Sequence, residues 1–244
     1  MISIVMTYRD RQEQLTRTLE SLKQYDPMDF NVIIVDDCSV RLIEYQELPY
    51  ECKVIRIEEK IYPNSSQVYN IGFLNALDSD IIIIQNAECY HGGDILGYAK
   101  TIKEDQYITF ACYSQGQEEE PGSVINNRCA TFDGESAWYN HPIYRPVGYH
   151  FCSAITTRNL IQLNGFDERF SPGIGYEDDY LLYRIRLLGL KVEITSDPIV
   201  YHQWHYTQVG LPNKLELIEK NKLLYQELIK ENNYIAQHLI TPDL

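Results

Sequence analysis

Short apolar runs alternate along the first half of the chain with segments of helical periodicity. Runs rich in β-branched residues predict four strands, at residues 2–6, 32–35, 53–57 and 80–84. Helical spacing lies between them, in Leu15, Leu19 and Leu22 and again over residues 65–77. Strands that are apolar throughout and separated by helices are typical of a parallel sheet with crossover connections. The pattern therefore predicts an open α/β fold.

The second half of the chain keeps this alternation, with one interruption. The pattern predicts strands at residues 107–113, 151–156 and 191–195. It predicts helices at residues 93–103, 157–163 and 213–231. Residues 114–145 carry neither period and are rich in Gly, Asn and Glu, which predicts either a lid or an ordinary loop insertion. No linker divides the chain cleanly. We therefore expect one domain over residues 1–210 and a C-terminal helical extension over residues 211–244.

Charge and composition argue against some kinds of binding partner. The chain has 35 acidic and 21 basic residues and a formal net charge of −14, so most of its surface repels nucleic acid and anionic lipid. A phosphate-bearing ligand would need a local cation or a bound metal. An apolar run such as residues 81–84 is far shorter than the roughly 20 residues of a membrane helix. We expect no nucleic-acid partner and no membrane span.

The cysteines and the N-terminal residues indicate where in the cell the protein is expected to lie. None of the six cysteines forms a CxxC pair, which suits free thiols in a reducing environment. The chain opens on a strand-like segment and not on a secretory leader. These features predict a cytoplasmic protein, or one held peripherally at the inner face of a membrane.

Three consecutive acids, Glu177, Asp178 and Asp179, stand at the start of a predicted helix. Free N–H groups and the helix dipole stabilise carboxylates there, so one interpretation is a well-made helix start. Asp178 shares a face with Leu182 and Ile185, which predicts that it points inward, whereas Asp179 lies on a wetter face. An inward carboxylate at a helix terminus can also serve as a general base at the floor of a cleft. From this segment alone both interpretations stay open.

Polar residues follow three of the predicted strands, as TYRDR (residues 7–11), DDCS (residues 36–39) and QNAE (residues 85–88). Ligands of open α/β sheets lie beyond the carboxyl ends of parallel strands. An aromatic ring there can stack on a base, a carboxylate can accept from a ribose hydroxyl, and an arginine can pair with phosphate. Together the segments suggest a nucleotide. Each is weak alone, because two successive aspartates also fit an Asx turn and the arginines fit a solvated helix start.

With these segments in this order, the chain resembles a GT-A glycosyltransferase close to the inverting family-2 type. The resemblance rests on TYRDR, VDDCS, YNIGFLNAL, QNAE in place of the DxD motif, and GFDERF with GYEDDYLLYRI. It implies a GT-A fold, which is an open, mostly parallel sheet flanked by helices. Within it, residues 1–113 would bind the nucleotide sugar and residues 146–210 would carry the acceptor and catalytic side.

The resemblance also implies roles for individual residues. The expected donor-binding set is Thr7, Tyr8, Arg9, Asp36, Asp37, Asn70, Asn86 and Glu88. Asp178 is expected to deprotonate the acceptor hydroxyl, with Glu177 as its supporting neighbour. Asp179 remains as the charge that complements the helix dipole.

The DxD position of this chain reads Asn86-Ala87-Glu88, so the first carboxylate is an amide and the second is longer by one methylene. Glu88 can still ligate a hard cation through oxygen. The resemblance places a histidine after the last core strand, where His202 or His205 would be a second ligand. Imidazole suits Mn²⁺ better than Mg²⁺. We expect a divalent cation, Mn²⁺ before Mg²⁺, and the altered motif leaves strict metal dependence open.

On the acceptor side, Trp138, Tyr139 and Trp204 are candidate sugar-stacking platforms, with ordinary packing as the alternative. The expected partners are a nucleotide-diphosphate sugar, with uridine diphosphate favoured as the carrier, and a glycan or glycolipid acceptor. Homo-oligomerisation is compatible with the sequence. The resemblance therefore implies an inverting glycosyltransferase.

Rival functions make different demands on the sequence. A sugar nucleotidyltransferase needs a glycine-rich turn after the first strand, and TYRDR has no glycine. A dinucleotide-dependent oxidoreductase needs GxGxxG after a strand, which is also missing. A non-catalytic protein that binds nucleotide sugars or glycans on the same scaffold stays open, because the DxD motif is altered.

Overall fold

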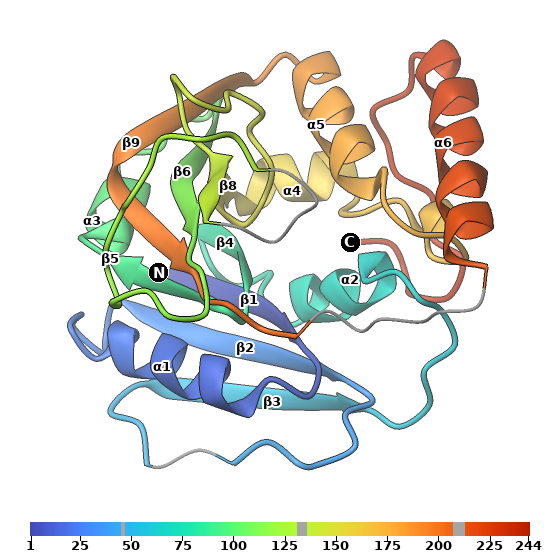
Figure 1. The fold of residues 1–244 in the computed structure, drawn as a ribbon. Helices are drawn as coiled ribbons and strands as arrows, with labels where there is room; N and C mark the ends of the chain where they lie inside the picture. Colours follow the sequence, from blue (N-terminus) through green and yellow to red (C-terminus); the bar gives the residue numbers. More distant parts are fainter. Residues whose placement is uncertain (45–46, 131–135, 207–212) are drawn as a thin grey trace.

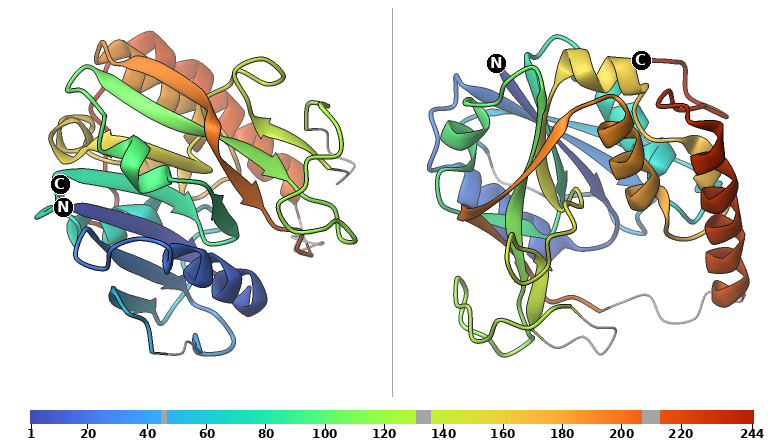
Figure 2. Two further views of the ribbon diagram at one scale, coloured as in Figure 1. Left: turned by 90° about the vertical axis from the view of Figure 1, so that its left-hand side faces the viewer. Right: turned by 90° about the horizontal axis from the view of Figure 1, so that it is seen from above.

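A twisted, open sheet runs through the molecule, with helices on both of its faces (Figures 1 and 2). The computed structural model describes residues 1–44, 47–130, 136–206 and 213–244. In this part of the chain the sheet has nine strands in the order β3-β2-β1-β4-β8-β6-β9-β5, with β7 paired to β6. Their bounds are β1 Ile2–Tyr8, β2 Phe30–Asp37, β3 Glu51–Ile57, β4 Ile81–Asn86, β5 Cys89–Gly92, β6 Gln106–Ser114, β7 Ala137–Asn140, β8 Cys152–Thr156 and β9 Lys191–His202.

The sheet is parallel at one side and mixed at the other. Strands β3, β2, β1 and β4 are parallel, so their carboxyl ends meet at one edge. The register places Thr7 beside Asn86, and Tyr8 beside Asp36. Strand β8 then runs antiparallel to β4 and to β6, whereas β6 and β9 are parallel to each other. The start of β8 therefore lies at the same edge as the ends of β1, β2 and β4.

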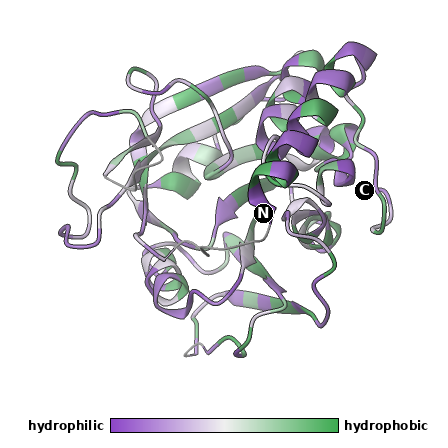
Figure 3. Ribbon diagram, turned by 45° about the vertical axis from the view of Figure 1, so that its right-hand side comes forward, coloured by the Kyte–Doolittle hydropathy of each residue, from purple (hydrophilic) through white to green (hydrophobic). Residues whose placement is uncertain are grey.

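Alternation along the strands divides the core into two layers. In β1, Ile4 and Met6 face α1 (Gln12–Leu22) and α3 (Ile95–Ala99), while Val5 faces the opposite layer. That opposite layer contains α2 (Ser66–Leu74), α4 (Thr157–Leu163) and α5 (Glu177–Leu187). Hydrophobic residues are accordingly frequent along the strands, whereas α6 (Lys214–Glu231) carries both hydrophobic and hydrophilic residues (Figure 3). Both faces of the sheet are covered, as its continuous apolar strands require.

The predicted open α/β class is confirmed, and the differences have local causes. The helix predicted over residues 93–103 is shorter, because Asp94 caps it and it ends at Ala99. The last predicted strand, residues 191–195, extends to His202. Two short strands, β5 and β7, were not predicted. Strand β7 falls within residues 114–145, so the prediction that this segment lacks regular structure is wrong in part; residues 131–135 lie outside the described residues.

The C-terminal segment returns to the body of the molecule. Helix α6 packs on α5 around Phe170, Tyr180 and Leu228. A 3-10 helix, Glu168–Phe170, lies beside it, and Glu168 accepts hydrogen bonds from the backbone N–H groups of Leu239 and Ile240. None of the helices described is long and apolar enough to cross a bilayer.

Candidate functional site

A cavity of about 680 Å³ lies at the edge where β1, β2 and β4 end. Its walls come from these strand ends, from the segment after β3, from the start of β8 and from the start of α5. The lining residues are Thr7, Tyr8, Arg9, Arg11, Asp37, Lys60, Ile61, Tyr62, Pro63, Ser65, Tyr69, Asn86, Glu88, His150, Pro172, Glu177, Asp178 and Leu217. A cavity of this size holds a nucleotide-sized ligand.

One end of the cavity combines aromatic, acidic and basic groups. Tyr8, Arg9 and Asp37 line it together, as predicted from the strand ends. Lys60 forms an ion pair with Asp37. Burial raises the pKa of the Asp37 carboxyl, and the Lys60 ammonium opposes that shift. The Arg9 guanidinium acts in the same direction as Lys60, so these two cations favour the charged form of the carboxylate.

Two predicted donor residues lie outside this cavity. Asp36 is buried, and its carboxylate binds Arg56 (2.7 Å, Nη1 to Oδ2) and accepts from the backbone N–H of Ser39. Asn70 is fully buried in α2 and donates to the backbone oxygen of Phe166 and to Glu168. Both side chains connect parts of the scaffold, and neither is brought to the cavity.

The three predicted acceptor aromatics also lie elsewhere. Trp138 is buried against Tyr113. Tyr139 stacks on Phe151 and meets His202 edge to face. Trp204 lines a separate hollow of about 600 Å³ next to α1. For Trp138 and Tyr139 the structure matches the alternative of ordinary packing.

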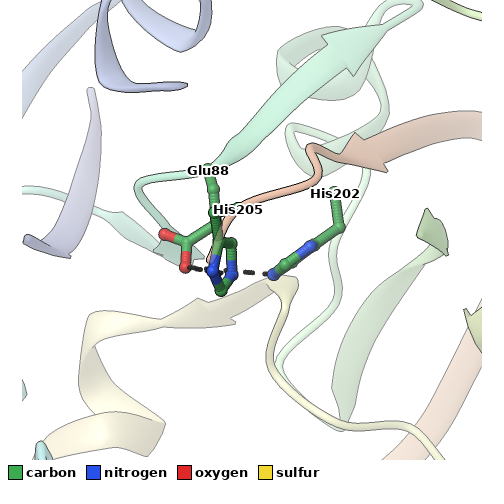
Figure 4. Close-up of side chains that lie close together, drawn as sticks. All are labelled: Glu88, His202 and His205. Atoms are coloured by element: carbon green, nitrogen blue, oxygen red, sulfur yellow. Dashed lines mark ion pairs between the residues drawn. The ribbon is translucent and has the colours of Figure 1, made fainter. Parts of the chain in front are cut away.

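Three candidate metal ligands converge beside the cavity. The Oε1 atom of Glu88 lies 3.5 Å from Nε2 of His205 and 3.9 Å from Nε2 of His202 (Figure 4). These three ligand atoms lie within 4.8 Å of one another. Two ligands of one ion, each about 2.1 Å from it, can be at most about 4.2 Å apart, and both distances from Glu88 to the histidines are shorter than that limit. The structure thus brings together Glu88, His202 and His205, the three candidate metal ligands.

The protonation of this cluster suits a cation. Burial lowers the pKa of His202 to about 3, with the neighbouring His205 and Arg11 acting in the same direction. Burial and Arg11 also lower the pKa of His205. Both rings are therefore neutral at physiological pH and can offer a lone pair. Arg11 forms an ion pair with Glu88, so this carboxylate already has one positive partner.

The start of α5 is built by an unusual turn. Gly175 and Tyr176 both have positive φ angles, of 72° and 67°, and Tyr176 occupies the position before the first helical residue. A left-handed conformation is uncommon for a bulky residue and is costly without support. Asn221 of α6 supplies support by donating to the backbone oxygen of Gly175 (2.8 Å). The C-terminal helix thus holds the turn that aims Glu177 and Asp178 at the cavity.

The three acids of α5 differ in environment. Asp178 lies against Nδ1 of His150, at 2.7 Å from its Oδ1 atom. Glu177 has one enclosed oxygen, and burial together with the Asp178 charge raises its pKa to about 7. Asp179 accepts a hydrogen bond from the hydroxyl of Tyr149 (2.6 Å). Only Glu177 and Asp178 line the cavity, in agreement with the helical stripe in the sequence.

Several cavity residues were not singled out from the sequence. Lys60 and Tyr62 follow the third parallel strand, so the rule applied to the other strand ends would have found them. His150 precedes β8, which is antiparallel to β4, and that rule does not cover its position. Tyr69 reaches the cavity from α2 and donates to Asn86 (3.1 Å).

Comparison with known proteins gives two family matches. A model described as glycosyl transferase family 2 matches residues 3–155, which is more than half of the chain. A model described as the N-terminal domain of galactosyltransferase matches residues 140–206. The two segments overlap and together reach from β1 to the histidine cluster.

Two curated relatives share part of their length with this chain. An uncharacterized glycosyltransferase of Haemophilus influenzae is 27% identical over 111 residues, which cover 45% of this chain and 37% of that protein. Human beta-1,4-galactosyltransferase 4 is 24% identical over 207 residues, which cover 82% of this chain and 48% of that protein. The chain therefore spans about half the length of these relatives, or less.

Solved structures share the arrangement of sheet and helices. A TarS fragment of S. aureus in complex with UDP-GlcNAc has a TM-score of 0.64 at 15% identity, covering 91% of this chain and 65% of that chain. GalNAc-T7 with UDP, GalNAc and Mn²⁺ has a TM-score of 0.64 at 16% identity, covering 94% of this chain and 50% of that chain. At these identities the likeness concerns the fold.

Proposed function

Because this chain belongs to glycosyl transferase family 2 and has the GT-A fold, we propose that it transfers a sugar from a nucleotide diphosphate to an acceptor hydroxyl, with inversion. The observation that carries this proposal is that one cavity is lined by nucleotide-type contacts, by Glu88 and by Asp178. Two structural neighbours were solved with uridine nucleotides, which favours a uridine diphosphate donor here. The acceptor is a glycan or a glycolipid.

The donor would lie along the strand ends. Tyr8 offers a ring to the base, Asp37 accepts from ribose hydroxyls, and Arg9 pairs with phosphate. Thr7 and Asn86 come from neighbouring strands in register and line the floor. Asp36 and Asn70 support this site from within the scaffold and make no contact with the donor.

Asp178 would act as the general base. The acceptor O–H bond breaks, its proton passes to the carboxylate, and the acceptor oxygen attacks the anomeric carbon from the face opposite the diphosphate. The bond from the anomeric carbon to the diphosphate oxygen breaks, and the nucleoside diphosphate leaves with that electron pair. A positioned base contributes roughly 10²–10⁴-fold to such a step.

Glu88, His202 and His205 would hold a divalent cation, and two neutral imidazoles favour Mn²⁺ over Mg²⁺. Such a cation supplies positive charge to the diphosphate leaving group. Arg11, paired with Glu88, lines the same cavity and can contribute positive charge of its own.

The first experiment pairs binding with turnover. Uridine, guanosine and thymidine diphosphate sugars are added to the protein with and without Mn²⁺, and thermal stability is measured. A ligand specific for the native state raises the melting temperature. The same samples are assayed for release of free nucleoside diphosphate. Stabilisation accompanied by release supports a transferase, stabilisation without release with any acceptor supports a binding protein, and no response to any nucleotide contradicts the proposal.

A further inference from the structure

His150 is the residue that holds Asp178. It lies two residues before β8, and its ring is packed edge to face against Tyr69 and Phe166, at centroid distances of 5.1 Å and 4.9 Å. This aromatic pocket leaves the ring little freedom to turn. Its Nδ1 atom lies 2.7 Å from Oδ1 of Asp178, and the two side chains form an ion pair.

The two oxygens of Asp178 are not equivalent. Oδ1 is enclosed and faces His150, whereas the side chain as a whole remains 30% exposed. The exposed part of the carboxylate therefore includes Oδ2, at the cavity wall. We propose that His150 is a positioning residue that fixes Oδ1 through Nδ1 and leaves Oδ2 to receive the acceptor proton. This inference rests on the proposed function, in which Asp178 is the base.

The contact defines the state of the imidazole. Nδ1 must carry the proton, because an unprotonated nitrogen would face a carboxylate oxygen with lone pairs on both sides. Within the part of the chain that the structure describes, neither Nδ1 of His150 nor Oδ1 of Asp178 has a hydrogen bond, so the ion pair is the polar contact of both atoms. The histidine gains and loses no proton in the reaction; it keeps the carboxylate oriented while Oδ2 takes the proton.

The charges that face His150 agree with this arrangement. Asp178 and Glu177 approach it from α5, and Tyr69 approaches from α2. Burial opposes a charged ring, but the Asp178 carboxylate outweighs it, with Glu177 adding to the effect, so the pKa of His150 is raised. Glu177, whose pKa is about 7, is largely protonated below neutral pH.

The direct test does not depend on turnover. The ¹⁵N chemical shifts of the histidine rings are titrated by NMR in the wild-type protein and in Asp178→Asn, with His150 assigned from His150→Asn. Loss of an opposite charge at this distance is expected to lower the pKa of His150 by about one unit or more. An unchanged pKa would overturn the inference, whether or not the protein transfers sugar.

A second test uses turnover, with nucleoside diphosphate release from UDP-glucose, UDP-galactose and UDP-GlcNAc as the probe. In His150→Asn the amide nitrogen can replace Nδ1, whereas in His150→Gln it reaches the place of Nε2 instead. We expect His150→Asn to retain most of kcat and His150→Gln to lose about tenfold or more, with donor KM nearly unchanged.

The matched control is Tyr149→Phe, which removes one hydrogen bond to Asp179 and none to Asp178. It should leave kcat in place. Equal kcat values in His150→Asn and His150→Gln would overturn the positioning role. No release by the wild-type protein would count against the proposed function, and the NMR titration would still decide the inference.

Discussion

Arg11 pairs with the same oxygen of Glu88, Oε1, that faces both His202 and His205. A cation bound between these ligands would share its carboxylate with a guanidinium. The altered DxD motif keeps one carboxylate, Glu88, and this carboxylate contacts both the arginine and the two histidines. Arginine and metal are expected to oppose each other at this site.

The first prediction concerns this competition. Arg11→Met should tighten Mn²⁺ binding about tenfold, which corresponds to about 1.4 kcal/mol, because a like charge is removed from the site. Isothermal titration calorimetry of Mn²⁺ into EDTA-treated protein measures the change in affinity. Arg9→Met is the matched control, since Arg9 lines the cavity without pairing with Glu88. Equal effects of the two variants would show that general charge, and not the Glu88 contact, sets the affinity.

The second prediction concerns Glu177 and stability. Its pKa in the folded protein is about 7, above the ordinary 4.5, so the folded state holds this proton more tightly than the unfolded state. The associated stability is present below pH 4.5 and is lost as the pH rises to about 7. Glu177→Gln should therefore be more stable than the wild type at pH 8, by up to roughly 3 kcal/mol, with the advantage gone near pH 4.5.

Urea unfolding at pH 4.5, 6 and 8 measures this difference. Asp179→Asn is the control, because Asp179 lies on the same turn of α5 and is partnered by Tyr149. A stabilisation by Glu177→Gln that is the same at all three pH values would contradict a raised pKa.

The third prediction concerns Lys60, which opposes the effect of burial on Asp37. In Lys60→Met the pKa of Asp37 should rise further, and a protonated carboxyl accepts poorly from ribose hydroxyls. Affinity for uridine diphosphate should fall about tenfold at pH 6 and recover in part at pH 8. Lys23→Met, which breaks an exposed ion pair with Glu20, controls for the loss of one charge. A loss that does not depend on pH would argue for a direct phosphate contact by Lys60.

The fourth prediction assigns Glu168 to structure. This carboxylate is fully buried and accepts from Asn70, from the hydroxyl of Thr241 and from backbone N–H groups of the C-terminal segment. Burial acts to raise its pKa, but these hydrogen bonds prevail and hold it below the ordinary value. Glu168→Gln should lower stability by about 1–3 kcal/mol at pH 7, and the loss should shrink as the pH falls below about 4.

Chemical unfolding at pH 7 and at about pH 3 measures this effect, with exposed Glu219→Gln as the control. Donor affinity should change far less than stability. A variant that unfolds normally but no longer binds nucleotide would contradict a purely structural role for Glu168.

The parallel half of the fold could be predicted from the sequence because its strands are continuous apolar runs. Continuous apolar runs such as 32–35 and 82–84 are buried, and polar residues follow each run directly. Thr7, Asp37 and Glu88 could be assigned to a cavity because parallel strand ends meet at one edge. Asp178 could be separated from Asp179 because a helix has a fixed period.

Other residues depended on pairings that no local pattern encodes. His150 reaches the cavity only because β8 is antiparallel to β4. Asn70 fits the family motif in sequence, yet α2 turns it toward Phe166 and Glu168, away from the cavity. The left-handed Tyr176 is stabilised by α6, which lies more than thirty residues further along the chain. Long-range packing decides each of these positions.

The most direct test of the account compares Asp178→Asn with Asp179→Asn in turnover of the nucleotide sugar that the binding screen selects. These acids are neighbours on α5, and both substitutions exchange a carboxylate for an amide of nearly the same shape. We predict that Asp178→Asn lowers kcat by about 10²–10⁴-fold with donor affinity preserved, while Asp179→Asn stays within a few-fold of the wild type. Full turnover in Asp178→Asn, or its loss in Asp179→Asn alone, would contradict the assignment of Asp178 as the base.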